Sequence, residues 1–382
     1  MKNKILLFIL MFFVTNSFSQ DYSVPVLEIN TNTRLAGFGE VGVVSSPFYY
    51  NTGLYQNPAL ISKNNKYAGI EAFYMPWLKK FNDDMSLSGF AGSYAIDSSN
   101  AFAVNFTYFD IGHIVYSNGN GEFFDADDPY EMFIKIAYNH SFNKSISTGI
   151  AFKYFRSDMI PPSYQNANIV NSIAFDLGVN YEKRYSLHNS SFINTSAGAA
   201  ITNLGPKVSY SDDADKQFIP TKLSLGLLIN PDINIKDKFR LNIELAYQAD
   251  KYLVPSDPTR DINGNIVDGY DTDISAFTAL YQSFYDAPDG FSEEIDEIGH
   301  KFGSEFRFSY MNYWYAAFRH GRRFEHESKG NRNYQTFGYG IGLFGLTLDY
   351  MRIKADSDSW LDKTWSITLG YVVNLDKNFF QF

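Results

Sequence analysis

The sequence predicts an all-β fold, a transmembrane antiparallel β-barrel of about 14 strands. Three observations support this prediction. The chain opens with an export signal, aromatic residues make up 18% of its 382 residues, and segments that alternate bulky and polar residues recur along it. Alternation indicates a strand because successive side chains of a strand point to opposite faces. Together with export and aromatic enrichment, it is typical of barrels that span an outer membrane.

Residues 1–19 have the pattern of a signal peptide. Lys2 and Lys4 precede an apolar run at 5–14, and Ser17 and Ser19 supply the small residues of a cleavage site. The run is shorter than the roughly 20 residues of a membrane-spanning helix, so we expect cleavage after Ser19. The chain contains no Cys, which excludes disulfides and thiol chemistry.

The segment 101–109 shows what the two faces of a strand are expected to meet. Phe102, Val104 and Phe106 share one face, and Ala103 and Asn105 share the other. A bulky face suits lipid and a small or polar face suits a lumen. The alternative is a secreted soluble domain whose bulky faces fill a core. The same pattern assigns strands to 67–75, 86–96, 101–110, 130–140, 146–157, 170–182, 192–202, 222–230, 238–249, 300–310, 313–322, 334–343, 344–353 and 364–375.

The connections between these strands alternate in length. Counted from the first strand, odd-numbered connections are mostly long and even-numbered ones mostly short. Bacterial barrels have this arrangement, with short periplasmic turns and long outer loops. We therefore expect a multi-pass protein of the cell outer membrane, with the barrel at 67–382. An even number of strands would leave both termini in the periplasm.

The longest predicted outer loop, 250–299, holds twelve acidic and two basic residues. A loop of this length in a compact protein is usually functional or disordered. Apolar residues at helical spacing favour a functional loop, and Ser292 with the two acidic residues after it could start a second short helix. The candidate partner-binding residues are Phe277, Leu280, Tyr281 and Phe284.

Residues 20–66 precede the first strand and mix apolar residues with glycines. We expect them to fold into the lumen as a hatch or plug; the alternative is a periplasmic tail. Six charged residues fall on predicted lumen faces and form either a polar conduit or, as we favour, a self-neutralising ionic plug. They are Lys135, Lys153, Arg240, Glu244, Glu305 and Arg307.

Three short motifs have simpler explanations than a bound ligand. The glycines at 340, 342 and 345 match a nucleotide-binding spacing, but a strand pattern follows them, which favours a tight hairpin. Residues 261–265 resemble the start of a calcium loop but lack its later ligands, so a turn is favoured. Glu325, His326 and Glu327 favour a solvated charge cluster over a metal site. We expect no enzyme activity and no cofactor.

Several stretches, taken in order, resemble one family over nearly all of the mature chain. They are RLAGFGEVGVVSSP, QNPALIS, YMPWLKKFNDDMSLSGFAGSY, FTYFDIG, DKQFIPTKLSLG, DAPDGFSEEIDEI and EHESKGNRNYQTFGYG. The family is the PorV/PorQ group of type IX secretion system outer-membrane proteins, found in Bacteroidota and similar to the FadL fatty-acid transporters. The resemblance implies a fourteen-stranded FadL-like barrel. It also implies a hatch motif at Asn57, Pro58 and Ala59.

The resemblance further implies a role in protein secretion. Such a protein binds the C-terminal signal domains of secreted cargo at the SprA translocon and delivers them to the PorU-containing attachment complex. Its partners would be these proteins and outer-membrane lipid, with no nucleic acid. The alternative function is FadL-like transport of hydrophobic small molecules across the outer membrane.

Overall fold

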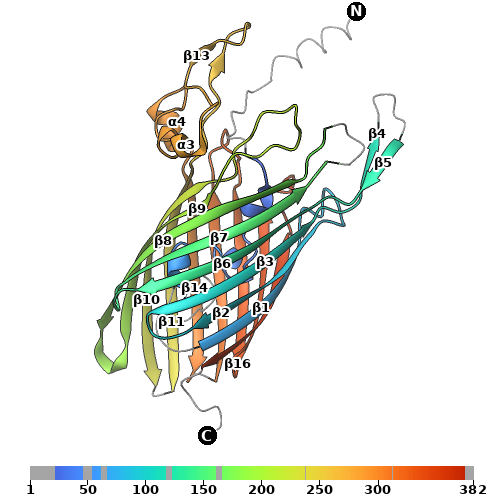
Figure 1. Cartoon of the computed structure of the whole chain (residues 1–382). Coiled ribbons are helices and arrows are strands. Elements are labelled where there is room, and N and C mark those ends of the chain that lie inside the picture. Colours follow the sequence, from blue (N-terminus) through green and yellow to red (C-terminus); the bar gives the residue numbers. More distant parts are fainter. Residues whose placement is uncertain are drawn as a thin grey trace, which may run out of the picture.

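The computed structural model describes residues 22–45, 54–61, 67–117, 123–160, 166–236, 238–311 and 313–374. Fourteen antiparallel strands form a closed barrel in which each strand pairs with its neighbours along the chain and β1 pairs with β18 (Figure 1). This confirms the predicted fold class. The barrel strands are β1 (Tyr67–Pro76), β2 (Ser86–Ala95), β3 (Asn100–Asp110), β6 (Tyr130–Ser141), β7 (Ile146–Asp158), β8 (Val170–Ser186), β9 (Phe192–Leu204), β10 (Lys222–Lys236), β11 (Phe239–Tyr252), β14 (Gly299–Tyr310), β15 (Trp314–Phe324), β16 (Tyr334–Leu343), β17 (Leu346–Ala355) and β18 (Trp365–Asn374).

The bulky faces of the strands point outward, as the alternation predicts. On β3, Phe102 is 46% exposed, whereas Asn105 is 1% exposed inside the barrel. On β10, the outward row consists of apolar side chains that are all exposed: Leu225, Leu227, Ile229, Ile233 and Ile235. Water disfavours such a continuous apolar surface, and lipid accommodates it. No described helix is long and apolar enough to cross a membrane.

The long connections gather at one end of the barrel (Figure 1). The loop between β11 and β14 contains the two helices that its sequence predicts, α3 (Ala276–Gln282) and α4 (Phe291–Asp296). The sequence did not predict two small hairpins. One pairs β4 (Ile114–Ser117) with β5 (Phe123–Asp127), and the other pairs β12 (Thr259–Arg260) with β13 (Ile266–Asp268). Strand β8 runs on to Ser186, so the connection at 183–191 is shorter than the sequence indicates.

Two of the motifs form turns. Phe344 and Gly345 join β16 to β17 with φ angles of 50° and 90°, a left-handed pair that suits a two-residue hairpin. The glycine motif is therefore a hairpin, as predicted. At 261–265, the Asp261 carboxylate accepts hydrogen bonds from the backbone N–H groups of Asn263 and Asn265, which closes a turn at the tip of the β12–β13 hairpin.

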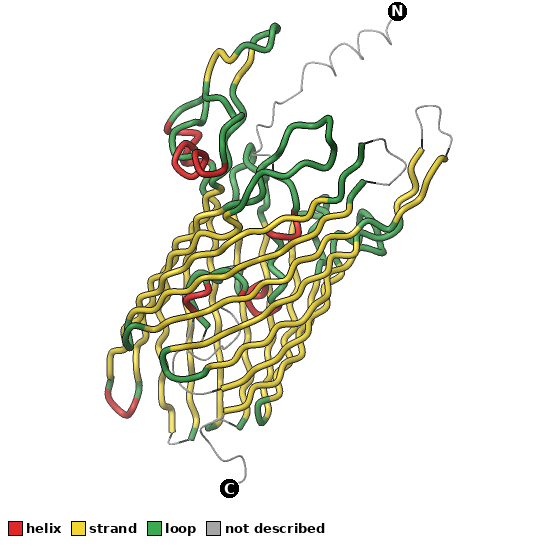
Figure 2. Tube along the Cα trace, viewed as in Figure 1, coloured by secondary structure: helices red, strands yellow, loops and turns green. Residues whose placement is uncertain are grey.

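Three short helices from the residues before β1 lie inside the barrel. They are η2 (Pro25–Leu27), α2 (Thr33–Gly37) and η4 (Pro58–Leu60), drawn in blue in Figure 1 and as the red segments within the barrel in Figure 2. Apolar side chains in and next to these helices are buried; Val24, Val26 and Leu35 are 0% exposed. Val24 and Val26 share a cluster with wall residues such as Phe73 and Phe133.

The described part of the N-terminal segment begins at the end of the barrel that carries the long loops. The Tyr22 ring stacks on Tyr252, the last residue of β11, at the end of the barrel that carries the long loops. Strand β18 ends at the opposite rim, where Asn374 pairs with Tyr67. The strand count fixes where the sheet begins and ends. It does not determine how far the segment before β1 extends along the lumen or at which rim that segment begins.

The outward face of β10 yields a prediction about membrane depth. Ile229 lies at the middle of the strand and Ile235 near its end, and both are exposed outward. Arginine on the lipid face costs about 2–4 kcal/mol at the bilayer midplane and about 0–1 kcal/mol near an interface. We expect Ile229→Arg to lower the unfolding free energy in lipid vesicles by the larger amount and Ile235→Arg by the smaller. Equal losses would show that β10 does not cross the bilayer at this depth.

Candidate functional site

The lumen contains ion pairs between wall strands. Lys135 of β6 and Lys153 of β7 both bind Asp176 of β8, with N–O distances of 2.6 and 2.9 Å. All three side chains are nearly inaccessible to water. The sequence predicts both lysines as lumen charges and places Asp176 on the same face, but nothing in it shows that the lysines share one carboxylate. Paired in this way, the three residues support closure of the lumen rather than a wet conduit.

A second set of ion pairs joins the N-terminal segment to the wall. Arg34 of α2 lies 2.7 Å from Glu244 of β11 and 3.4 Å from Glu305 of β14. Glu305 also binds Arg319 at 2.5 Å, and Arg319 binds Asp349 at 2.6 Å. Removing one partner of a buried ion pair typically costs about 3–5 kcal/mol, because the other charge remains buried. The N-terminal segment and the wall therefore stabilise each other.

A third set lies at the end of the barrel near the long loops. Glu28 binds Lys222 at 2.7 Å, and Lys301 binds Asp250 at 2.8 Å. Glu40 forms an ion pair with Arg323 and accepts a hydrogen bond from the Tyr334 hydroxyl. Glu28 and Glu40, the two carboxylates in the described part of the N-terminal segment, thus meet an opposite charge on the wall, as Arg34 does.

The remaining predicted lumen charges lie elsewhere. Arg240 binds Asp232 at 2.8 Å near the β10–β11 turn, and the Arg307 guanidinium lies 4.0 Å from the centre of the Tyr315 ring. Neither arginine belongs to the three sets of ion pairs above. The sequence pattern places both arginines on the lumen face but does not locate the charges that hold the segment.

The predicted hatch motif is fixed against the wall by hydrogen bonds. Asn57 accepts a hydrogen bond from the Ala59 N–H and donates to the Val43 and Val179 carbonyls. Asn139 of β6 donates to the Ala59 carbonyl at 2.8 Å, and so does the Ser147 hydroxyl of β7. These contacts hold η4 against β6, β7 and β8.

Two wall glycines make room for this motif. A Cβ atom added at Gly149 would lie 2.2 Å from the Pro58 carbonyl carbon, and one added at Gly178 would lie 2.0 Å from the Asn57 side-chain oxygen. Such distances are shorter than any van der Waals contact. The motif therefore fits a recess that only glycine provides on β7 and β8.

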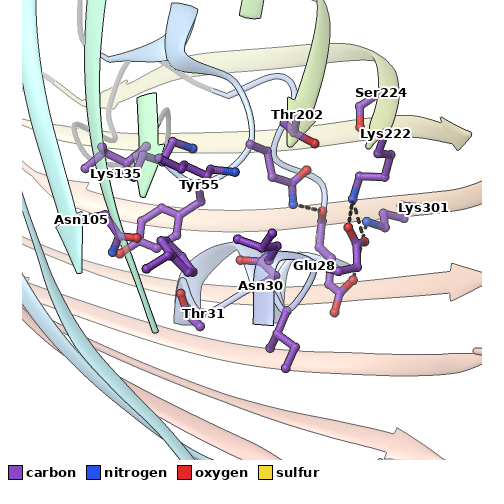
Figure 3. A pocket seen from close by; sticks show the side chains of 17 residues that line it. Glu28, Asn30, Thr31, Tyr55, Asn105, Lys135, Thr202, Lys222, Ser224 and Lys301 are labelled. Atoms are coloured by element: carbon purple, nitrogen blue, oxygen red, sulfur yellow. Dashed lines mark hydrogen bonds and ion pairs between the residues drawn. The ribbon is translucent and has the colours of Figure 1, made fainter. Parts of the chain in front are cut away.

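The cavity between the described hatch and wall residues is small. Its volume is about 40 Å³, and it is lined by Leu27, Tyr55, Asn105, Lys135, Lys222 and Lys301 among others. Figure 3 shows Lys222 and Lys301 on one side of it and Lys135 on the other. A space of roughly 10–15 Å³ holds a water molecule, whereas ligand pockets span roughly 300–1,000 Å³. This cavity suits a few water molecules.

The loop between β11 and β14, which we call the α3–α4 loop, presents apolar side chains to solvent. Phe277 is 75% exposed, Tyr281 54%, Phe284 48% and Phe291 81%. Leu280 is only partly exposed. Three of the four predicted partner-binding residues are therefore accessible. Phe291 is also accessible but was not predicted, because it begins a helix instead of continuing the spacing of the first one.

The underside of the α3–α4 loop is anchored. Lys251 binds Glu294 at 2.8 Å and Glu297 at 2.6 Å. Lys329, from the connection between β15 and β16, binds Glu293 at 2.5 Å and Glu297 at 3.0 Å. An apolar cluster of Phe218, Val254 and Ala279 lies beneath. The exposed aromatic side chains are thus held on an ordered platform.

The charged motif at 325–327 contributes to the same region. Glu325 binds Arg323 at 2.5 Å and Arg332 at 2.6 Å, so a charge cluster is the correct interpretation. It is less solvated than predicted, because the Glu325 side chain is only 6% exposed. Burial opposes ionisation there, but the two guanidinium groups outweigh it and lower the pKa of Glu325.

These features define a class of protein: an outer-membrane β-barrel whose lumen is occupied by its own N-terminal segment and whose longest loop displays aromatic residues. The sequence model of the family described as "Type IX secretion system protein PorV" matches residues 16–259. The chain belongs to this family and is an outer-membrane protein of the type IX secretion system. The resemblance stated from the sequence is confirmed.

The barrel is also similar to solved structures. A FadL homologue from Pseudomonas aeruginosa shares 9% sequence identity, with 92% of this chain and 99% of that chain covered and a TM-score of 0.42. The toluene transporter TodX from Pseudomonas putida shares 9% identity, with 89% and 97% covered and a TM-score of 0.42. A comparison with curated proteins gave no match.

The glycine recess yields a prediction about the hatch. In Gly149→Ala the new methyl group must displace the Pro58 backbone, whereas in Gly92→Ala the nearest atom lies 3.5 Å away. Overpacking of this kind costs about 1–3 kcal/mol. We expect Gly149→Ala to lower the thermal midpoint and raise ion conductance in planar bilayers, and Gly92→Ala to match the wild type. Unchanged conductance and thermal midpoint in an assembled Gly149→Ala barrel would show that the hatch motif does not need a glycine at this position.

A buried carboxyl in the α3–α4 loop yields a pH prediction. Asp286 is fully buried and forms no ion pair with the described residues. Its pKa is raised from 3.8 to about 7, mainly because burial disfavours the charged form and also because the Glu297 and Glu294 carboxylates lie nearby. The folded loop then keeps a proton that the unfolded loop releases, so loop stability falls as pH rises from about 4 to about 7.

We expect hydrogen exchange of the loop, corrected for intrinsic rates, to be faster at pH 8 than at pH 5. Asp286→Asn keeps the shape and removes the charge, so exchange in this variant should be slow at both values. The explanation fails if Asp286→Asn retains the pH dependence of the wild type.

Proposed function

We propose that this chain binds the C-terminal signal domains of secreted cargo at the SprA translocon and delivers them to the PorU-containing attachment complex. The observation that carries the proposal is the row of exposed aromatic side chains on the α3–α4 loop. Water disfavours such groups, and exposed apolar patches on ordered platforms mark protein interaction sites. Membership in the PorV family supports type IX secretion as the process in which the contact is made.

The anchored underside supports a docking surface rather than a flexible tether. Aromatic residues on a rigid support bind with little loss of conformational freedom, which is why a few of them dominate the energy of many interfaces. The loop is also rich in acidic residues, and some of them anchor it. Glu293, Glu294 and Glu297 form ion pairs with Lys251 and Lys329 on the underside of the loop, whereas the aromatic groups face solvent.

Transport of hydrophobic small molecules is the competing function. It requires a pocket that is large enough for a ligand and that is lined by apolar rather than charged side chains. The cavity beside the hatch measures about 40 Å³ and is lined by several lysines. Both properties favour the protein-binding function, in which the barrel serves as a closed scaffold and keeps its periplasmic and outer faces separated.

Point substitutions on α3 test the proposal without removing the loop. Phe277→Ser and Tyr281→Ser delete exposed rings that the fold does not need. A hot-spot aromatic contributes about 2 kcal/mol or more, roughly a 30-fold change in Kd. We expect the double variant to lose co-purification with SprA and secretion of cargo while the barrel remains heat-modifiable.

The matched control is Phe81→Ser, which removes a 68% exposed ring from a different outer connection. It should secrete normally. Normal secretion and SprA binding by the Phe277→Ser, Tyr281→Ser protein at wild-type abundance would exclude this face of α3 as the docking surface.

A further inference from the structure

The first described residues of the chain contact the end of the barrel that carries the long loops. Tyr22 stacks on Tyr252 with ring centres 5.1 Å apart. The Ser23 backbone N–H donates to the Phe218 carbonyl at 2.8 Å, and its hydroxyl donates to Gln217 at 2.8 Å. Gln217 and Phe218 lie in the long connection between β9 and β10. These contacts place Tyr22 and Ser23 among the long loops.

The next residues confirm this placement by independent contacts. The Val26 N–H donates to Glu131, the second residue of β6, and the Leu27 carbonyl accepts from Asn203, near the end of β9. Glu28 binds Lys222, the first residue of β10. Each wall residue lies at the strand end that joins a long connection. Three separate strands therefore hold the segment near the same rim.

The far end of the segment lies toward the opposite rim. Pro58 and Ala59 contact β6 and β7 at Asn139 and Ser147, close to the short turn between these strands. Strand β1 then begins at Tyr67, beside the end of β18. The described residues before the first strand thus extend through the lumen from the rim with long loops toward the rim with short turns.

We infer that the mature N-terminus of this protein is exposed at the cell surface, at the base of the α3–α4 loop. Cleavage after Ser19 would leave only Gln20 and Asp21 ahead of Tyr22, too short a stub to return through a lumen that the segment itself occupies. The inference rests on the orientation used in the proposed function, with the long loops outside.

Single-cysteine labelling tests this topology, because the chain has no native Cys. The variants are Asp21→Cys at the N-terminus, Asn263→Cys in the exposed turn between β12 and β13, and His188→Cys in the exposed turn between β8 and β9. Each is treated with a membrane-impermeant maleimide on intact cells and again after permeabilisation of the outer membrane. We expect Asp21→Cys and Asn263→Cys to label equally before and after, and His188→Cys to label only after.

Labelling of Asp21→Cys only after permeabilisation, with Asn263→Cys labelled on intact cells, would overturn the inference and leave the proposed function standing. Protection of Asn263→Cys together with labelling of His188→Cys on intact cells would overturn both, because the long loops would then face the periplasm.

Cross-linking provides a measurement that does not depend on membrane orientation. Tyr22→Cys with Tyr252→Cys should form a disulfide when copper phenanthroline oxidises the two thiols, and Tyr22→Cys with His188→Cys should not. The disulfide is read as a change in gel mobility that a reductant reverses. An assembled barrel in which the Tyr22 and Tyr252 positions fail to cross-link would also overturn the inference.

Discussion

The interior of a closed fourteen-stranded sheet has to be filled. A barrel of eight strands is just wide enough for its own side chains to fill the space, and the width grows with the number of strands. In this barrel the wall contributes small and charged residues and leaves room for a second layer. The N-terminal segment supplies that layer, and the recess glycines and the ion pairs of Glu28, Arg34 and Glu40 are consequences of fitting it there.

Charge complementarity decides how the segment is held. An unpaired charge in a dry interior costs several kcal/mol, so a filled lumen with ionisable residues requires partners for them. Arg34 meets Glu244 and Glu305, while Glu28 and Glu40 meet Lys222 and Arg323. The segment and the wall carry opposite charges at matching places. An apolar layer would fill the same space but would not specify one position of the segment as sharply.

The sequence predicts the strands and their faces because both depend on a local period of two. Phe102 and Asn105 face outward and inward as expected, and the helical spacing around Phe277 also appears in the structure. Contacts across the lumen are different. Arg34 and Glu244 are 210 positions apart, and no local pattern encodes which of several inward charges will meet.

The same limit applies to two other features. In the sequence, Gly149 is one more small residue on a lumen face. Only the structure shows that Pro58 packs against it. The direction of the N-terminal segment cannot be derived from strand counting, because a chain can enter a lumen and stop at either rim. Hairpins such as β4–β5 were missed since their strands are too short to show a period.

Pairing of β1 with β18 closes the barrel between its first and last strands. These strands lie at opposite ends of the sheet's sequence, so their pairing spans more of the chain than any other pairing in the barrel. Contacts between distant parts of a chain form slowly. Before they form, β1 and β18 are unpaired edges that can associate with other chains. Thr33, which contacts Ser366 and Thr368 of β18, links the segment to the final strand and can guide closure of the seam.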